Sequence, residues 1–162
     1  MAEVKRTRSF HNFSTAKTVG IIFNASSQDS YIPSRQLIQE LMAANIHVVA
    51  MGLVDKPESM TNFPHNKDID YTVPSRLKWN GLPKDPALED FLKKDMDILL
   101  EISLRDDFVV KYLVALSKAK FKINRFDDPE LFDLRIHSKY GVSVPYYIDQ
   151  VKQYLSLLKM AV

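Results

Sequence analysis

The stretch that decides the fold is "TVGIIFN", residues 18–24, followed directly by "ASSQDS", residues 25–30. The first part is an almost unbroken apolar run, which is typical of a strand buried on both faces of a parallel sheet. The second part is rich in hydroxyl groups, as are many turns that lead from a strand into a helix. Together they predict a central strand of an α/β domain, with a polar turn at its carboxyl end.

The rest of the chain alternates strand-like and helix-like segments. Strands are expected at residues 18–24, 46–55, 69–73 as a short edge strand, 96–103, 121–126 and 131–137. Helices are expected at residues 34–45, 85–95, 107–120 and 144–158. Such alternation predicts a doubly wound, mostly parallel, five- to six-stranded Rossmann-like sheet with helices on both faces.

Local signals mark the ends of the expected helices. The first helix is predicted to begin after Pro33 with Ser34 as its N-cap, because serine side chains accept hydrogen bonds from free amides there. Met42 is counted on its apolar face, and Asn45 is a stop signal. Asp85 is expected to cap the second helix.

Composition narrows the class of protein. The chain has 162 residues, which predicts one domain, and no cysteine, which excludes disulfides and thiolate chemistry. Its 22 basic and 20 acidic residues are too balanced for a surface that coats nucleic acid, so a nucleic-acid partner is not expected. No run approaches the ~20 apolar residues of a membrane span. A cytoplasmic protein is the default expectation.

The first residues, "MAEVKRTRSFHNF", differ in character from the rest. They are basic and lack the apolar core of a secretory signal. Residues 1–16 are therefore interpreted as a frayed basic tail, and residues 17–162 as a single α/β domain.

A ligand site is expected where the winding of the sheet reverses. If the strand at 96–103 lies beside the strand at 18–24, their carboxyl ends flank the topological switch point, where such sheets bind ligands. Two polar loops, "NASSQDS" and "SLRDD", would line this crevice, and their groups suit an anion or a polyol. The candidate ligand-binding residues are Asn24, Ser26, Ser27, Gln28, Ser103, Arg105 and Asp106.

Several interpretations of these loops stay open. Ser, Asn and Asp also crowd strand-to-helix turns without any ligand, and Arg105 could form a surface ion pair. The leading hypothesis is a non-catalytic domain that binds a small polar ligand or a protein partner. The rival is an enzyme with Asp106 or Asp107 as base and Arg105 holding the substrate. A homodimer through the final helix or the edge near Val73 is a third hypothesis.

No motif in the chain specifies a cofactor. The four glycines do not form a dinucleotide-binding turn or a P-loop, and the four histidines lie in separate segments without the spacing of a metal site. The cofactor is thus unknown and no metal is expected. Trp79, in "LKWNGLP", could stack on a sugar or base, or could pin a loop to the sheet.

Four segments together carry a family resemblance: "KTVGIIFNAS", "LKWNGLPKD", "DILLEISLRDDFVVKYLVALSKAKFKINRF" and the closing amphipathic helix. From Lys17 onward the chain resembles a family of small bacterial proteins of unknown function, which implies a single α/β domain. The order of these segments is more distantly similar to the N-terminal half of heptosyltransferase-type (GT-B) glycosyltransferases. Those enzymes use two such domains and bind the nucleotide sugar mostly through the second, and the similarity implies an enzyme of sugar or nucleotide metabolism.

Overall fold

A computed structural model of the chain describes residues 5–63, 67–74, 85–137, 139 and 141–158. Trp79 and its loop lie outside these residues. The strands are β1 (Thr18–Asn24), β2 (His47–Leu53), β3 (Ile69–Thr72), β4 (Ile98–Glu101), β5 (Phe121–Asn124) and β6 (Leu134–Arg135). The α-helices are α1 (Gln28–Ala43), α2 (Pro86–Lys93), α3 (Phe108–Leu116) and α4 (Val144–Leu157), with 3-10 turns at Pro57–Asn62 and Pro129–Leu131.

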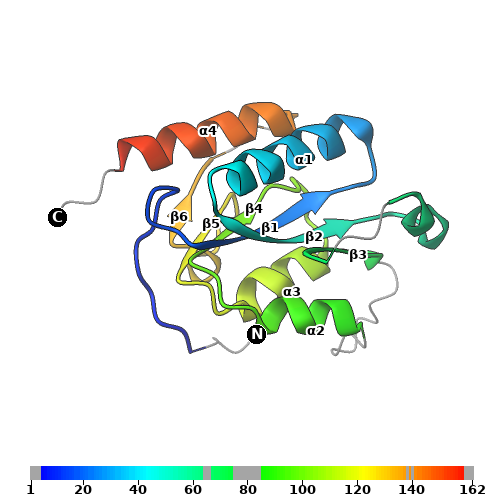
Figure 1. Cartoon of the computed structure of the whole chain (residues 1–162), viewed down its shortest axis with the longest axis horizontal. Coiled ribbons are helices and arrows are strands. Elements are labelled where there is room, and N and C mark those ends of the chain that lie inside the picture. Colours follow the sequence, from blue (N-terminus) through cyan, green and yellow to red (C-terminus); the bar gives the residue numbers. More distant parts are fainter. Residues whose placement is uncertain (1–4, 64–66, 75–84, 138, 140, 159–162) are drawn as a thin grey trace.

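Strand β1 lies at the centre of the sheet, as predicted. In the described part of the chain the sheet has six strands in the order β3-β2-β1-β4-β5-β6, and every pairing is parallel. The chain winds outward from β1 to β3, then returns and winds the other way from β4 to β6 (Figure 1). The predicted doubly wound α/β fold is confirmed, with β3 as an edge strand.

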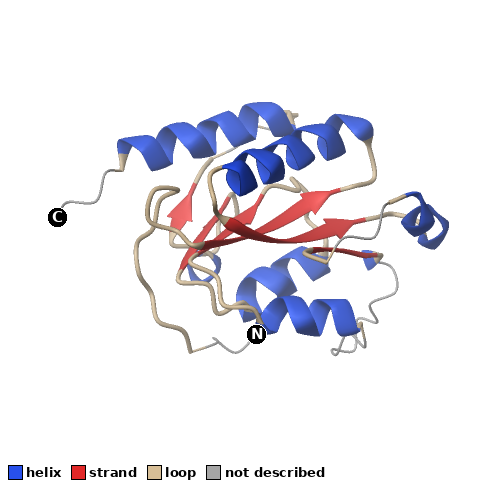
Figure 2. Cartoon of the chain, in the orientation of Figure 1, coloured by secondary structure: helices blue, strands red, loops and turns tan. Residues whose placement is uncertain are grey.

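Helices cover both faces of the sheet (Figure 2). Ile21 and Phe23 of β1 belong to the core that α1 and α4 share with the sheet. Ile22, between them, belongs to the second core, which α2 and α3 cover. Successive side chains of a strand point to opposite faces, so the apolar run of β1 is buried on both sides. All three side chains have no exposed surface.

The first helix begins earlier than the sequence suggested. Helix α1 starts at Gln28, and Pro33 lies inside it. Ser34 is therefore not the N-cap; its hydroxyl donates to the carbonyl of Ser30 at 2.7 Å within the helix. Met42 is also wrong as a core residue, since it is 47% exposed. The prediction failed because a proline usually marks a helix boundary, whereas Pro33 is the sixth residue of α1 and leaves one backbone hydrogen bond of the helix unmade.

Other end signals are confirmed. Asn45 adopts the left-handed conformation at φ 63° directly after α1, which suits a helix stop. Asp85 caps α2 by accepting from the amide of Ala87 at 3.0 Å. Helix α3 is shorter than expected and ends at Leu116, and the last predicted strand contracts to the two residues of β6.

The N-terminal segment is packed rather than frayed. Residues 5–16 have no helix or strand, but Arg6 forms a two-point ion pair with Asp133 at 2.8 and 2.9 Å. The ring of Phe10 lies 5.0 Å from that of Phe121, and the amide of Ser9 donates to the carbonyl of Lys120 at 3.1 Å. The segment therefore lies at the end of the sheet where the parallel strands begin, next to the first residue of β5.

Among the described residues, no helix is long and apolar enough to cross a membrane.

Candidate functional site

The site follows from the topology of the sheet. Strands β1 and β4 are neighbours, and the chain leaves them in opposite directions. Their carboxyl ends therefore flank the switch point, where open α/β sheets bind ligands. Asn24 is the last residue of β1, and the loop at residues 102–107 follows β4. The arrangement expected from the sequence is thus the one the structure has.

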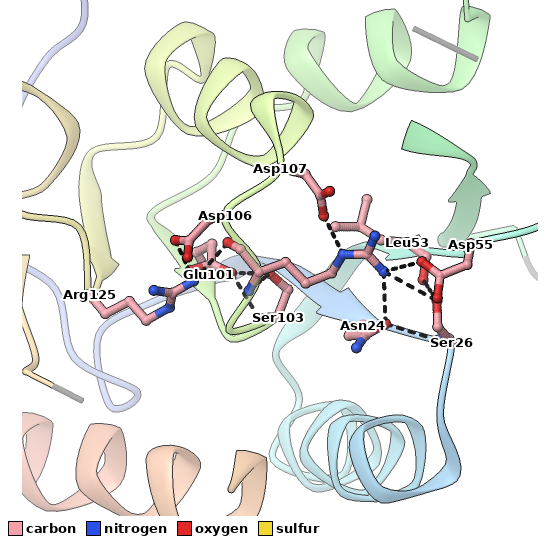
Figure 3. Close-up of polar contacts among 10 residues, drawn as sticks. Asn24, Ser26, Leu53, Asp55, Glu101, Ser103, Asp106, Asp107 and Arg125 are labelled. Carbon is pink, nitrogen blue, oxygen red and sulfur yellow. Dashed lines mark hydrogen bonds and ion pairs between the residues drawn. The ribbon is translucent and has the colours of Figure 1, made fainter. Parts of the chain in front are cut away.

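Arg105 lies across the switch point, since its guanidinium contacts Asn24, Asp55 and Asp107, whose side chains are labelled in Figure 3. Its Nη1 lies 2.8 Å from a carboxylate oxygen of Asp55, which follows β2, and its Nε pairs with Asp107. The same Nη1 lies 3.3 Å from Oδ1 of Asn24 and 3.2 Å from Oγ of Ser26. One guanidinium therefore ties the β4–α3 loop to the ends of β1 and β2.

The turn after β1 faces this guanidinium. Oδ1 of Asn24 accepts from the backbone amide of Ser26 at 2.9 Å, a local turn that asparagine commonly forms. The hydroxyl of Ser26 lies 3.3 Å from the carbonyl of Leu53 and is placed to donate to it. The two candidates Asn24 and Ser26 thus meet Arg105, and neither caps helix α1.

The backbone of Arg105 makes a second set of contacts, with Ser103 and Arg125. The amide of Arg105 donates to the hydroxyl of Ser103 at 3.2 Å, and its carbonyl accepts from Arg125 at 2.7 Å. Arg125 also pairs with Asp106 at 3.1 Å. The candidates Ser103 and Asp106 are therefore connected to Arg105 through its backbone. We call Asn24, Ser26, Asp55, Glu101, Ser103, Arg105, Asp106, Asp107 and Arg125 the switch-point network.

Two predicted residues do not join the switch-point network. Ser27 is the N-cap residue of α1, but its side chain makes no capping hydrogen bond. Gln28 is the first residue of that helix, and both side chains are exposed. They lie at the rim of the site, and no contact links either side chain to Arg105 in the described part of the chain.

Glu101 ends β4 inside the protein. Its side chain has no exposed surface, and its Oε1 accepts from both the amide and the hydroxyl of Ser103, the amide at 2.8 Å. Burial raises the pKa of Glu101, although the hydrogen bonds from Ser103 and the charge of Arg125 act in the opposite direction. A carboxyl group with a raised pKa at the end of a central strand is unusual away from functional sites.

Three buried polar atoms, one of Glu101 and two of its neighbours, have no hydrogen-bond partner among the described residues. They are Oε2 of Glu101, Nε of Arg125 and the hydroxyl of Tyr147, which belongs to α4. Burial and the charge of Glu101 raise the pKa of Tyr147, while Arg125 lowers it, so the three groups influence one another electrostatically. Buried polar atoms are paired in the great majority of cases, so this cluster is the least satisfied part of the described core.

Sequence reasoning missed four residues that matter here: Asp55, Glu101, Arg125 and Tyr147. The first three follow or end strands at the same edge of the sheet as Asn24, so the rule that predicted the two loops also applies to them. Tyr147 lies on a helix and reads as one apolar position among several. No sequence signal distinguishes it.

Comparisons with known proteins identify a family but no activity. The family of unknown function DUF6913 matches residues 1–158, so the chain belongs to it. The prediction of a family of unknown function is confirmed, and the match includes the N-terminal segment as well as the sheet. No curated protein and no solved structure matches the chain.

Proposed function

We propose that this member of the DUF6913 family is a non-catalytic domain that binds a small, neutral, hydroxyl-bearing molecule of the sugar type at the switch-point network. The observation that supports it is the position of Arg105, whose guanidinium joins groups from the ends of β1 and β2. Polar groups from three chain segments converge there, as small-molecule sites require.

The charges favour a neutral ligand over an anion. Asp55 and Asp107 pair with Arg105, and Asp106 pairs with Arg125, so both guanidinium groups are already compensated. Burial alone would lower the pKa of Arg105, but its bonds and charge interactions with Asp107 and Asp55 raise it, which keeps it protonated. A phosphate would have to approach three carboxylates to reach these cations.

Groups suited to hydroxyls remain available. The side chain of Asp55 is 60% exposed and that of Asp106 is 78% exposed, and both can accept from a sugar hydroxyl. The amide nitrogen of Asn24 donates to no described residue, and Ser26 is exposed beside it. Such a set of acceptors and donors around a fixed arginine suits a polyol.

A thermal-shift screen tests this function. Neutral sugars, nucleotide sugars and sugar phosphates are added to the full chain, and a neutral sugar is expected to raise the melting temperature in proportion to its affinity. Arg105→Ala and Asn24→Ala should each remove that shift. Arg135→Ala, which removes an arginine paired with Asp127 at the far strand β6, should keep it. No shift with any neutral sugar, or a shift that survives both site variants, rejects the proposal.

One observation favours a second candidate, an enzyme of sugar or nucleotide metabolism related to the glycosyltransferases. Glu101 is a buried carboxyl with a raised pKa beside unpartnered Tyr147 and Arg125 atoms, the kind of environment that prepares a general acid or base. The bases expected from the sequence, Asp106 and Asp107, are instead held in ion pairs with Arg125 and Arg105.

Product analysis separates the two candidates. Purified chain is incubated with nucleotide sugars, and release of the nucleotide is followed by chromatography. Turnover that falls at least a hundredfold in Glu101→Gln, with ligand binding retained, supports the enzyme. Sugar binding without turnover in the wild-type chain supports the binding domain.

Protein partners, self-association and a cytoplasmic location also belong to this proposal. Helix α4 exposes Tyr146, Tyr154 and Leu157, at 55%, 45% and 78%, and these residues would form the contact of a homodimer through the final helix. Light scattering after size exclusion measures the mass directly, and a strict monomer at all concentrations removes the homodimer.

A further inference from the structure

A hollow lies at the opposite end of the sheet from the switch-point network, where the strands begin. It is an open cavity of about 430 Å³, formed where the N-terminal segment meets the turns before β4 and β5. Cavities of this size accommodate small molecules. We call it the amino-edge hollow, and its lining residues are Lys5, Arg6, Thr7, Asp95, Lys118 and Lys120.

Two of its cations are structural. Arg6 is held by Asp133 and also donates to the carbonyl of Ala119 at 3.0 Å, and its side chain is only 5% exposed. Lys120 lies 3.4 Å from a carboxylate oxygen of Asp97. Both charges are compensated by carboxylates outside the lining, so they are less available to a ligand than an ammonium group without a partner.

The other two cations are available. Lys5 and Lys118 are exposed, they come from segments more than a hundred residues apart, and neither has an ion-pair or hydrogen-bond partner among the described residues. Lysine is a common phosphate ligand because its ammonium is a compact charge with three donors. Two such groups around one cavity favour an anionic occupant over a neutral one.

Asp95 and Thr7 restrict the kind of anion. A carboxylate in the wall repels a polyanion but accepts a hydrogen bond from a hydroxyl, and threonine can donate or accept. The lining residues include no aromatic side chain in the described part of the chain, so nothing there would stack on a nucleobase. Two free lysines also provide too few phosphate contacts for nucleic acid.

We propose that the amino-edge hollow is a binding site for a phosphorylated, hydroxyl-bearing small molecule of the sugar-phosphate class. Lys5 and Lys118 contact the phosphate, and Asp95 accepts from a hydroxyl. This site is independent of the switch-point network and of the ligand proposed for it.

Calorimetric titration of the full chain tests the site with four probes: glucose 6-phosphate, ribose 5-phosphate, inorganic phosphate and glucose. A sugar phosphate should bind, and inorganic phosphate should bind at least fivefold more weakly. The double variant Lys5→Gln, Lys118→Gln should weaken sugar-phosphate binding at least tenfold. Asp95→Asn should reduce the preference for the sugar phosphate over inorganic phosphate.

Two controls keep the outcome interpretable. Lys152→Gln removes one lysine charge from α4, where Lys152 pairs with Glu40, and should leave the affinity unchanged. Arg105→Ala should abolish binding of a neutral sugar at the switch-point network without changing sugar-phosphate affinity, so the two proposals fail separately. Because Lys5 and Lys118 are exposed and have no ion-pair partner in the described part of the chain, circular dichroism should show an unaltered fold in the double variant.

Three results overturn the proposal: no binding of either sugar phosphate at millimolar concentration, equal affinity for inorganic phosphate, or unchanged affinity in the double lysine variant.

Discussion

The two ends of strand β4 carry carboxylates in opposite surroundings. Asp97, just before β4, accepts from the backbone amides of Lys17 at 2.7 Å and Thr18 at 3.3 Å, and Lys120 lies beside it. Glu101, the last residue of β4, is fully buried, and one of its oxygens has no hydrogen-bond partner among the residues that the structure describes. The carboxylate before β4 is thus satisfied by its own chain, whereas the carboxylate at the end of β4 keeps an oxygen without a partner among the described residues, as buried groups at functional sites often do.

The strongest test of this comparison is removal of Arg6, which holds the amino edge together. Arg6→Ala leaves Asp133 partly buried without its two-point partner, and we expect the free energy of unfolding to fall by about 3 kcal/mol. Urea denaturation followed by circular dichroism measures it. Arg8→Ala is the matched control, because Arg8 is 55% exposed at 3.7 Å from Asp133 and should cost about 0.5 kcal/mol or less. Equal losses in both variants would contradict a packed N-terminal segment.

Removal of Arg105 tests the carboxyl edge. Arg105→Ala should lower the free energy of unfolding by about 1 to 2 kcal/mol, less than Arg6→Ala, because Asp55 is largely solvated and its ion pair is screened. Arg105→Lys should recover less than half of the loss, since an ammonium cannot reach Asp55, Asp107 and Asn24 together. The same denaturation experiment applies. A loss below about 0.3 kcal/mol would show that the switch-point network does not stabilise this edge.

Glu101 should make stability fall as the pH rises. Its pKa is raised in the folded chain, so the folded state holds the proton at pH values where the unfolded chain releases it. Stability is fully present below the unfolded pKa of about 4.3 and is lost as the pH rises through the folded pKa. Glu101→Gln should be more stable than the wild type at pH 7 and equal to it near pH 4. The loss of stability at neutral pH is limited, because Glu101 can take up a proton instead of staying ionised in the core. Melting temperatures between pH 4 and 8 measure this loss.

Asp97 should make stability fall as the pH falls, opposite to Glu101, and its effect should be the smallest of the four. Burial alone would raise its pKa, but the hydrogen bonds from Lys17, Thr18 and Lys120 lower it. Its contribution to stability is therefore present above the unfolded pKa of about 3.9 and is lost as the pH falls through the folded value. Asp97→Asn should be slightly less stable at pH 7, and the difference should shrink on acidification. A difference that grows in acid would contradict this assignment.

The sequence predicted the sheet well because its strands are buried on both faces. Runs such as residues 18–24 leave little choice of structure, and the reversal of winding between β1 and β4 follows from short right-handed connections. The start of α1 was harder, because Pro33 and Ser34 carry local signals that the longer helix overrides. Propensity is a weak guide where tertiary packing decides.

The site was predicted in outline but not in its contacts. The position of Asn24, Ser26 and Arg105 was enough to predict that they lie close together, since each ends or follows a strand at the carboxyl end of the sheet. The partner of Arg105 across the switch point, Asp55, depends on side-chain directions that no periodicity reveals. Periodicity does predict the burial of Tyr147 on the apolar face of α4, but not that its hydroxyl has no partner among the described residues. The packing of the N-terminal segment was likewise invisible, because Arg6 finds Asp133 at a separation of 127 residues.

The central position of β1 has a consequence for how the chain folds during synthesis. β1 is made before its second neighbour, β4, and the Thr18–Asp97 contact just before β4 already spans 79 residues. Pairings between such distant segments form slowly, because a long loop must close first. Until β4 emerges, the central strand β1 has an open edge, which other chains can pair with. The nascent chain therefore passes through a vulnerable interval that ends only after β4 has emerged and paired with β1.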